Sequence, residues 1–149
     1  MIVICDTSSL IRLYKSQTLS LLIPVFGEVF LPAAVYEECQ GLLKEAIDVC
    51  QFSIRQPTSV IFTQFGAGER AALNLALDTA CSIVLVDDKK AINAASRVNI
   101  KTITTLQFFV LAKAKGLVVN VKPYIDGLLL QGEGLDDQEI KEILRLVNE

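Results

Sequence analysis

The pattern of apolar and polar residues along the chain predicts short strands that alternate with helices. Apolar, β-branched runs at residues 2–5, 28–31, 82–86 and 100–104 are typical of buried parallel strands. Helical patterns occupy residues 10–15, 19–26, 70–77, 89–97 and 106–115. Because strands that alternate with helices build a mostly parallel sheet with both faces covered, we expect a three-layer α/β/α sandwich.

Residues at the boundaries of these elements predict where helices begin. Thr7 or Ser8 is expected to cap the first helix, since hydroxyl side chains accept hydrogen bonds from the free amides of a helix N-terminus. Pro32 is expected to be the first residue of the helix after the second strand. Residues 41–63 are expected to form a variable connection.

The C-terminal tail predicts one more helix, over residues 136–148. Asp136 and Glu139 have the spacing of a capping box. An apolar stripe follows at Ile140, Ile143, Leu144 and Val147. No Ser-, Gln- or Gly-rich segment divides the chain, so we expect a single domain over residues 1–149. Its C-terminal helix would pack on that domain or on the partner in a dimer.

Composition limits where the protein works. The 149 residues are 52% hydrophobic, which is ample for one core. The apolar region 19–35 is interrupted by Pro24, Gly27 and Pro32, so it does not form a membrane-spanning helix. The N-terminus lacks the features of a secretory signal, and the four cysteines form no C-x-x-C pair. We therefore expect a cytoplasmic protein without membrane association or structural zinc.

Charge and histidine content narrow the possible chemistry. The chain has no histidine, which excludes Ser-His-Asp and Cys-His catalysis and removes the commonest general base. Carboxylates must then carry any reaction. The net charge of −3 argues against an extensive nucleic-acid surface, although it leaves room for a local basic patch.

Acidic residues follow two of the predicted strands. Asp6 comes directly after the first strand, and Asp87 and Asp88 come after the third, at positions where α/β sheets bind ligands. Glu38 and Glu69 lie on two other elements. Each acid alone has an ordinary structural role, as a cap or an exposed helix residue. Four acids that converge would repel one another without a cation, and an all-oxygen donor set suits Mg²⁺ or Mn²⁺.

Four segments in this order resemble the PIN-domain ribonucleases, and among them the VapC-type toxins of toxin-antitoxin pairs. The resemblance covers nearly the whole chain and rests on residues 4–11 (ICDTSSLI), 31–38 (LPAAVYEE), 66–72 (GAGERAA) and 86–91 (VDDKKA). The chain is most similar to a branch with a Gly-x-Gly-Glu segment, a double Asp and a downstream Gly-Thr-Leu. Thr104 stands in the glycine position of that last motif, where threonine resists a positive φ.

The resemblance implies a metal-dependent endoribonuclease. Its catalytic acids would be Asp6, Glu38, Glu69 and Asp88; its metal ligands Asp6, Glu69, Asp87 and Asp88; its supporting hydroxyls Ser8 and Thr105. Glu38 is preferred to Glu37 because the family acid ends a V-x-x-E pattern, which begins here at Val35. Arg70, Lys89 and Lys90 are candidates for holding RNA phosphates. A small antitoxin and a homodimer are also implied.

Other protein classes fit the acids less well. A response-regulator receiver places its acid pair after the first strand, which is the wrong order for this chain. A haloacid-dehalogenase phosphatase requires D-x-D, and Ser8 stands where its second Asp would be. A non-catalytic PIN-like module that binds RNA or protein remains the alternative. The complete acid set favours the enzyme, because a module without metal gains nothing from carboxylates that repel one another.

Overall fold

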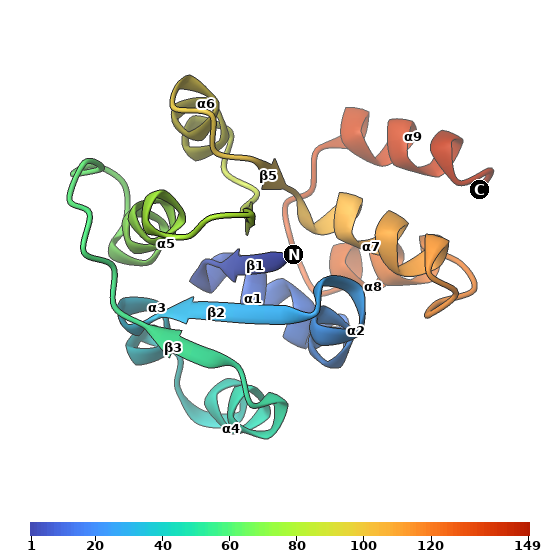
Figure 1. The fold of residues 1–149 in the computed structure, drawn as a ribbon. Coiled ribbons are helices and arrows are strands. Elements are labelled where there is room, and N and C mark those ends of the chain that lie inside the picture. The colour runs from blue at the N-terminus through green and yellow to red at the C-terminus, as the bar shows by residue number, and fades with distance from the viewer.

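A computed structural model describes residues 1–149, and its centre is a five-stranded sheet in which every strand pair is parallel (Figure 1). The strands are β1 (Ile2–Cys5), β2 (Glu28–Pro32), β3 (Ser53–Arg55), β4 (Ser82–Leu85) and β5 (Thr102–Ile103), in the order β3-β2-β1-β4-β5. Val3 in β1 lies opposite Val29 in β2 and Ile83 in β4. The predicted three-layer α/β/α architecture is confirmed.

Helices join the strands and cover both faces of the sheet. They are α1 (Thr7–Lys15), the 3-10 turn η1 (Leu19–Leu21), α2 (Leu22–Phe26), α3 (Ala33–Glu38), α4 (Gly41–Cys50), α5 (Ala67–Asp78), α6 (Lys89–Arg97), α7 (Thr105–Ala114), α8 (Lys122–Leu130) and α9 (Asp137–Leu146). None of them combines the length and the apolar character needed to cross a bilayer.

Alternating side chains of the central strand build two separate cores. Ile4 belongs to a cluster with residues of α5 and α6, whereas Val3 and Cys5 belong to a larger cluster with residues of α1, α2 and α7. Successive side chains of a strand point to opposite faces, so the two clusters mark the two faces of the sheet. Figure 1 shows α5 and α6 on one side, with α7, α8 and α9 on the other.

Several predicted boundaries are corrected by the structure. Asp6, rather than Thr7 or Ser8, caps α1, because its Oδ1 accepts a hydrogen bond from the Ser9 amide. Pro32 ends β2 and precedes the first helical residue of α3. The stretch 41–63 is not only a connection, since it contains α4 and the edge strand β3. A three-residue exposed strand carries too little alternation to be detected from sequence.

The elements after β4 also differ in detail. The predicted strand 100–104 is reduced to two residues. Thr104 has φ −87° and caps α7, so the family's glycine position needs no left-handed conformation in this chain. The capping box predicted for α9 is wrong: Asp136 caps that helix, but Glu139 accepts a hydrogen bond from the Thr104 hydroxyl instead. The box with both reciprocal bonds is at α7, between Thr104 and Gln107.

The C-terminal segment packs against the larger core. Ile143 of α9 is buried, and Ile140, Leu144 and Val147 are half-buried against the same cluster. The Glu149 side chain accepts hydrogen bonds from the Val121 and Lys122 amides at the start of α8. Glu149 therefore joins the segment that follows α9 to the start of α8.

Candidate functional site

The candidate site lies beyond the carboxyl ends of β1 and β4. The chain runs outward from β1 through β2 to β3 and returns to β4 on the other side, so these two neighbours form the topological switch point where open α/β sheets bind ligands. A cavity of about 400 Å³ lies there. Its lining is Asp6, Ser8, Arg12, Glu69, Asp87, Asp88, Lys89, Ile92, Thr104, Gly134, Leu135, Asp136 and Glu139.

Asp6 is the most buried acid of the cavity, with 2% of its surface exposed. It stands one residue after β1, and the amide of Ser9 holds its Oδ1 at 2.9 Å. The Ser9 hydroxyl donates to the carbonyl of Leu85 at 3.0 Å, which ties the first turn of α1 to the end of β4. The pKa of Asp6 is raised to about 6. Burial is the main cause and the charges of Asp87 and Glu69 act in the same direction, whereas the Ser9 hydrogen bonds act to lower the pKa.

Glu69 lies between other acids in the first turn of α5. Burial raises the pKa of Glu69, and the charges of Asp88 and Glu38 raise it further. Its Oε2 is buried and accepts no hydrogen bond. Glu38 accepts a hydrogen bond from the Thr7 hydroxyl at 2.6 Å and is not part of the cavity lining. The structure thus brings Glu38 next to Glu69, at the side of the cavity.

Gly68 explains the Gly-x-Gly-Glu motif in physical terms. A Cβ at this position would lie 2.8 Å from the Thr7 hydroxyl and 3.2 Å from both carboxylate oxygens of Glu38. The first turn of α5 approaches the Thr7–Glu38 pair so closely that any side chain at position 68 would have to displace this pair. The glycine therefore permits Glu69 to reach the acids of the neighbouring elements.

The two adjacent aspartates after β4 have different roles. Asp88 caps α6 through Oδ2, which accepts from the Ala91 amide at 3.0 Å, and Oδ1 accepts no hydrogen bond. Both oxygens of Asp87 are engaged: Oδ1 accepts from the Thr105 amide and Oδ2 from the Thr105 hydroxyl, at 2.8 and 2.7 Å. Thr105 thereby holds Asp87 by both carboxylate oxygens.

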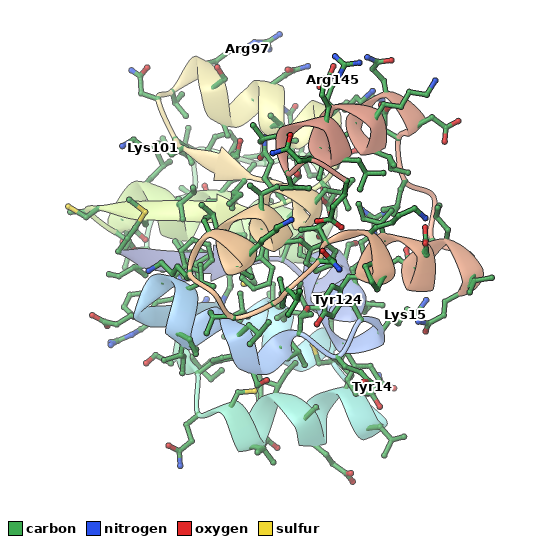
Figure 2. The ribbon with its side chains drawn as sticks, turned by 90° about the vertical axis from the view of Figure 1, so that its right-hand side faces the viewer. Tyr14, Lys15, Arg97, Lys101, Tyr124 and Arg145 are labelled. Carbon is green, nitrogen blue, oxygen red and sulfur yellow. The ribbon has the colours of Figure 1, made fainter.

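Arg12 joins Asp87 to the turn between α8 and α9. Its Nη1 is 2.8 Å from Asp87 Oδ2, its Nε donates to Glu133, and its Nη2 donates to the carbonyl of Gly134. Lys15 also pairs with Glu133, at 2.9 Å. Burial lowers the pKa of Arg12, but Asp87 and Glu133 outweigh this effect and raise it. Figure 2 shows Lys15 beside the end of α8.

Sequence reasoning missed this network and the residues that it brings to the cavity. Arg12 and Glu133 are 121 positions apart, and nothing in either local pattern points to the other. Thr104, Asp136 and Glu139 also line the cavity without having been predicted. The sequence pattern marked Asp136 and Glu139 as capping residues of a helix. Because capping alone accounts for both residues, the pattern did not indicate that they also line the acid cavity.

The three cations proposed for RNA phosphates are separated by the fold. Lys89 lines the cavity and pairs with Asp136 at 2.8 Å. Lys90 lines a different hollow, on the other flank of α6, and Arg70 lines neither. Ser8 lines the acid cavity, as a hydroxyl beside Asp6 should.

The donor chemistry of the cavity fits a hard divalent cation. No three His, Cys, Asp or Glu side chains are already arranged to hold a metal ion. The orphaned Oε2 of Glu69 and the free oxygens of Asp6 and Asp88 nevertheless offer carboxylate ligands that lack other partners. Asp87 is less available, because Thr105 and Arg12 already occupy its oxygens.

The all-parallel sheet, with carboxylates at its switch point, shows an α/β protein with an acidic candidate site. A sequence model of a family described as the PIN domain matches residues 2–149, so the chain belongs to the PIN-domain family. PIN domains are commonly nucleases that act with divalent metal ions. No curated protein matches the chain.

Proposed function

We propose that this protein is a metal-dependent endoribonuclease that hydrolyses RNA phosphodiester bonds at the acid cavity. The observation that carries the proposal is the pair formed by the buried Asp6 and the half-buried Glu69, whose pKa values are raised in a cavity that also contains Asp88. Uncompensated buried carboxylates cost stability, so a cavity that retains them is best explained by a function that needs their charge.

Asp6, Glu69 and Asp88 would hold the cation, with Mg²⁺ and Mn²⁺ as the ions that suit oxygen ligands. The bound ion would activate water and stabilise the negative charge that develops on the phosphate. Glu38 would act beside Glu69 through its charge, and Thr105 and Arg12 would keep Asp87 in place at the cavity wall. Ser8 and Lys89 also line this cavity and would contact a phosphate oxygen of the RNA.

The direct test is cleavage of a fluorescent RNA by the purified chain with Mn²⁺ or Mg²⁺. We expect cleavage that stops in EDTA and that falls about 100-fold or more in Glu69→Gln, because the cation that would stabilise the transition state loses a charged ligand. Glu45→Gln is the matched control, since Glu45 is exposed on α4 and makes no side-chain hydrogen bond. Cleavage that persists in EDTA, or equal loss in both variants, contradicts the proposal.

The biological role that we propose is the toxin of a toxin-antitoxin pair, working in the cytoplasm and held in check by a small antitoxin. This part rests on the resemblance of the motifs at Asp6, Glu69 and Asp88 to the VapC-type branch. A short neighbouring reading frame whose product binds this chain and stops its cleavage of RNA is the expected finding. A non-catalytic module would instead bind RNA equally well with and without a metal ion.

A homodimer is also proposed, on the family resemblance alone. The apolar run 19–26 and the apolar stripe of the C-terminal helix contribute to the core of the chain itself: Leu22 and Phe26 are buried in the larger core, and so is Ile143. Light scattering is expected to give about twice the 16.3 kDa of the chain. A mass that stays at the monomer value over a wide concentration range contradicts this expectation.

A further inference from the structure

A second hollow lies on the flank of α6 that faces away from the acid cavity. Its volume is about 540 Å³. Lys90, Asn93 and Arg97 line it from α6, and Gln64 and Phe65 line it from the segment before α5. The three α6 residues are three and four positions apart, so they form one stripe along the helix.

Helix α6 separates this hollow from the acid cavity. Lys89 and Ile92 line the acid cavity, whereas the next residues, Lys90 and Asn93, line the second hollow. A helix with its side chains is about 10 Å across, so an extended strand that crosses it reaches both sites. The short segment from Phe65 to Glu69 links the two hollows on the α5 side.

The lining of the hollow is positively charged, whereas carboxylates outnumber cations in the lining of the acid cavity. The hollow contains two cations and no carboxylate, in a protein whose net charge is −3. Neither Lys90 nor Arg97 takes part in any ion pair of the structure. Figure 2 shows Arg97 on α6 at the outer surface of the molecule. Two unpaired cations on one stripe are suited to bind an anion.

Helix stability does not account for Lys90. It lies in the first turn of α6, where the positive end of the helix dipole disfavours another positive charge. Arg97, in the last turn, has a favourable position for the dipole and contributes there whether or not a ligand is bound. The unfavourable position of Lys90 is therefore the stronger sign of an anionic ligand.

Phe65 gives the hollow an aromatic wall. It has φ 75°, a left-handed conformation that costs a bulky residue about 1–3 kcal/mol. Its side chain is half-buried against the core beneath α5 and α6 and also lines the hollow. An aromatic ring, two side-chain amides and two cations together match the base, the base edges and the phosphate of a nucleotide.

We propose that this hollow binds a nucleotide of single-stranded RNA next to the phosphate held at the acid cavity. Lys90 and Arg97 contact backbone phosphate, the base stacks on Phe65, and Asn93 and Gln64 reach its edge. The inference rests on the proposed function, because it takes the same RNA as ligand. It also explains how an acidic site acquires a polyanion: the attraction comes from the opposite flank of α6.

The test is binding of a fluorescent single-stranded oligoribonucleotide to the full chain in EDTA, followed by anisotropy over a range of salt concentrations. The double variant Lys90→Gln/Arg97→Gln is expected to bind about tenfold more weakly. Its plot of log K against log salt is expected to be less steep by about 1.4, which is 0.7 for each lost phosphate contact with a single strand. Phe65→Leu is expected to weaken binding about fivefold or more through lost stacking.

The matched control is Lys101→Gln/Arg145→Gln, which removes the same charge from exposed cations that form no ion pair and do not line the hollow. This control is expected to retain the affinity and the salt dependence of the parent. Thermal melts of all variants verify folding. If the hollow variant binds like the control, or if the parent binds no RNA in EDTA, the inference is overturned. The inference is also overturned if polyglutamate binding depends on Lys90 and Arg97 as strongly as RNA binding does.

Cleavage with Mn²⁺ is measured separately, so the two proposals can fail independently. If the parent binds RNA through Lys90 and Arg97 but does not cut it, the nucleotide site is supported and the nuclease proposal is contradicted. If the parent cuts RNA but the double variant binds RNA in EDTA as well as the parent does, the nuclease proposal is supported and the nucleotide site is contradicted.

Discussion

Asp6→Asn is expected to be more stable than the parent protein in metal-free buffer at pH 7.5, and to have lost metal-dependent cleavage. The Asp6 carboxyl is 2% exposed, and its pKa is raised to about 6 from an ordinary value of 3.8. At 1.36 kcal/mol for each pH unit, the ionised buried group costs the fold up to about 3 kcal/mol. Asparagine removes this cost and keeps an oxygen that can accept the Ser9 amide.

The sign of the pH dependence follows from the raised pKa. Between pH 4 and 6 the folded parent binds more protons than the unfolded chain, so its free energy of unfolding falls as the pH rises through this window. Well below pH 4 the carboxyl is protonated in both states and the penalty disappears. The advantage of Asp6→Asn is therefore expected to be largest above pH 6, to be small near pH 4 and to disappear at lower pH.

Melting curves of the two proteins in EDTA at several pH values measure this effect. About 3 kcal/mol corresponds to a rise of roughly 6–12 °C for a chain of this size. Saturating Mn²⁺ should narrow the difference, since metal at 100 times its dissociation constant stabilises the parent by about 2.7 kcal/mol and the variant by less. Glu45→Gln should show neither effect. A variant that melts below the parent at pH 7.5 contradicts the account of Asp6.

The second large effect is expected from Arg12→Met, which should lower the free energy of unfolding by about 2–3 kcal/mol. The side chains of Arg12 and Asp87 are each 16% exposed. Loss of the Arg12 guanidinium leaves the negative charges of Asp87 and Glu133 with less compensation. Thr105 and Lys15 still contact these two acids, so we expect a cost below the roughly 3–5 kcal/mol that is typical of a broken, fully buried pair.

Arg12→Met should also reduce RNA cleavage, because the turn between α8 and α9 forms part of the cavity wall. Gly134 and Asp136 line the cavity, and Arg12 fastens this turn through Glu133 and the Gly134 carbonyl. A loosened wall gives the acids a less defined arrangement. We expect a loss of about tenfold or more, since small displacements at a catalytic site have large effects on the rate.

A double-mutant cycle separates the ion pair from the loss of side-chain packing. Asp87→Asn combined with Arg12→Met should cost less than the sum of the single changes, with a coupling of about 1 kcal/mol or more. Lys122→Met is the control: the Lys122–Asp126 pair is about half exposed, and its loss should change stability by about 0.5 kcal/mol at most. Additive single effects at Arg12 and Asp87 would show that the pair contributes no specific stabilisation.

The sequence by itself determined the order and type of most elements. Runs such as residues 2–5 and 83–86 are apolar because their strands are covered on both faces, and this pattern is local. It also put Asp6, Asp87 and Asp88 at strand ends, where parallel strands bring their carboxyl ends to one edge of the sheet. Short elements such as β3 were not predicted, because three exposed residues show no periodic pattern of apolar and polar positions.

The tertiary structure alone decided what each acid and cation does. Asp87 and Asp88 are adjacent in sequence, yet Thr105 and Arg12 occupy both oxygens of Asp87 while Asp88 caps α6 with one. Lys89 and Lys90 are also neighbours, yet they line different hollows because successive helix residues point about 100° apart. These roles depend on partners up to 121 positions away, and contacts over such separations arise only when the whole chain has folded.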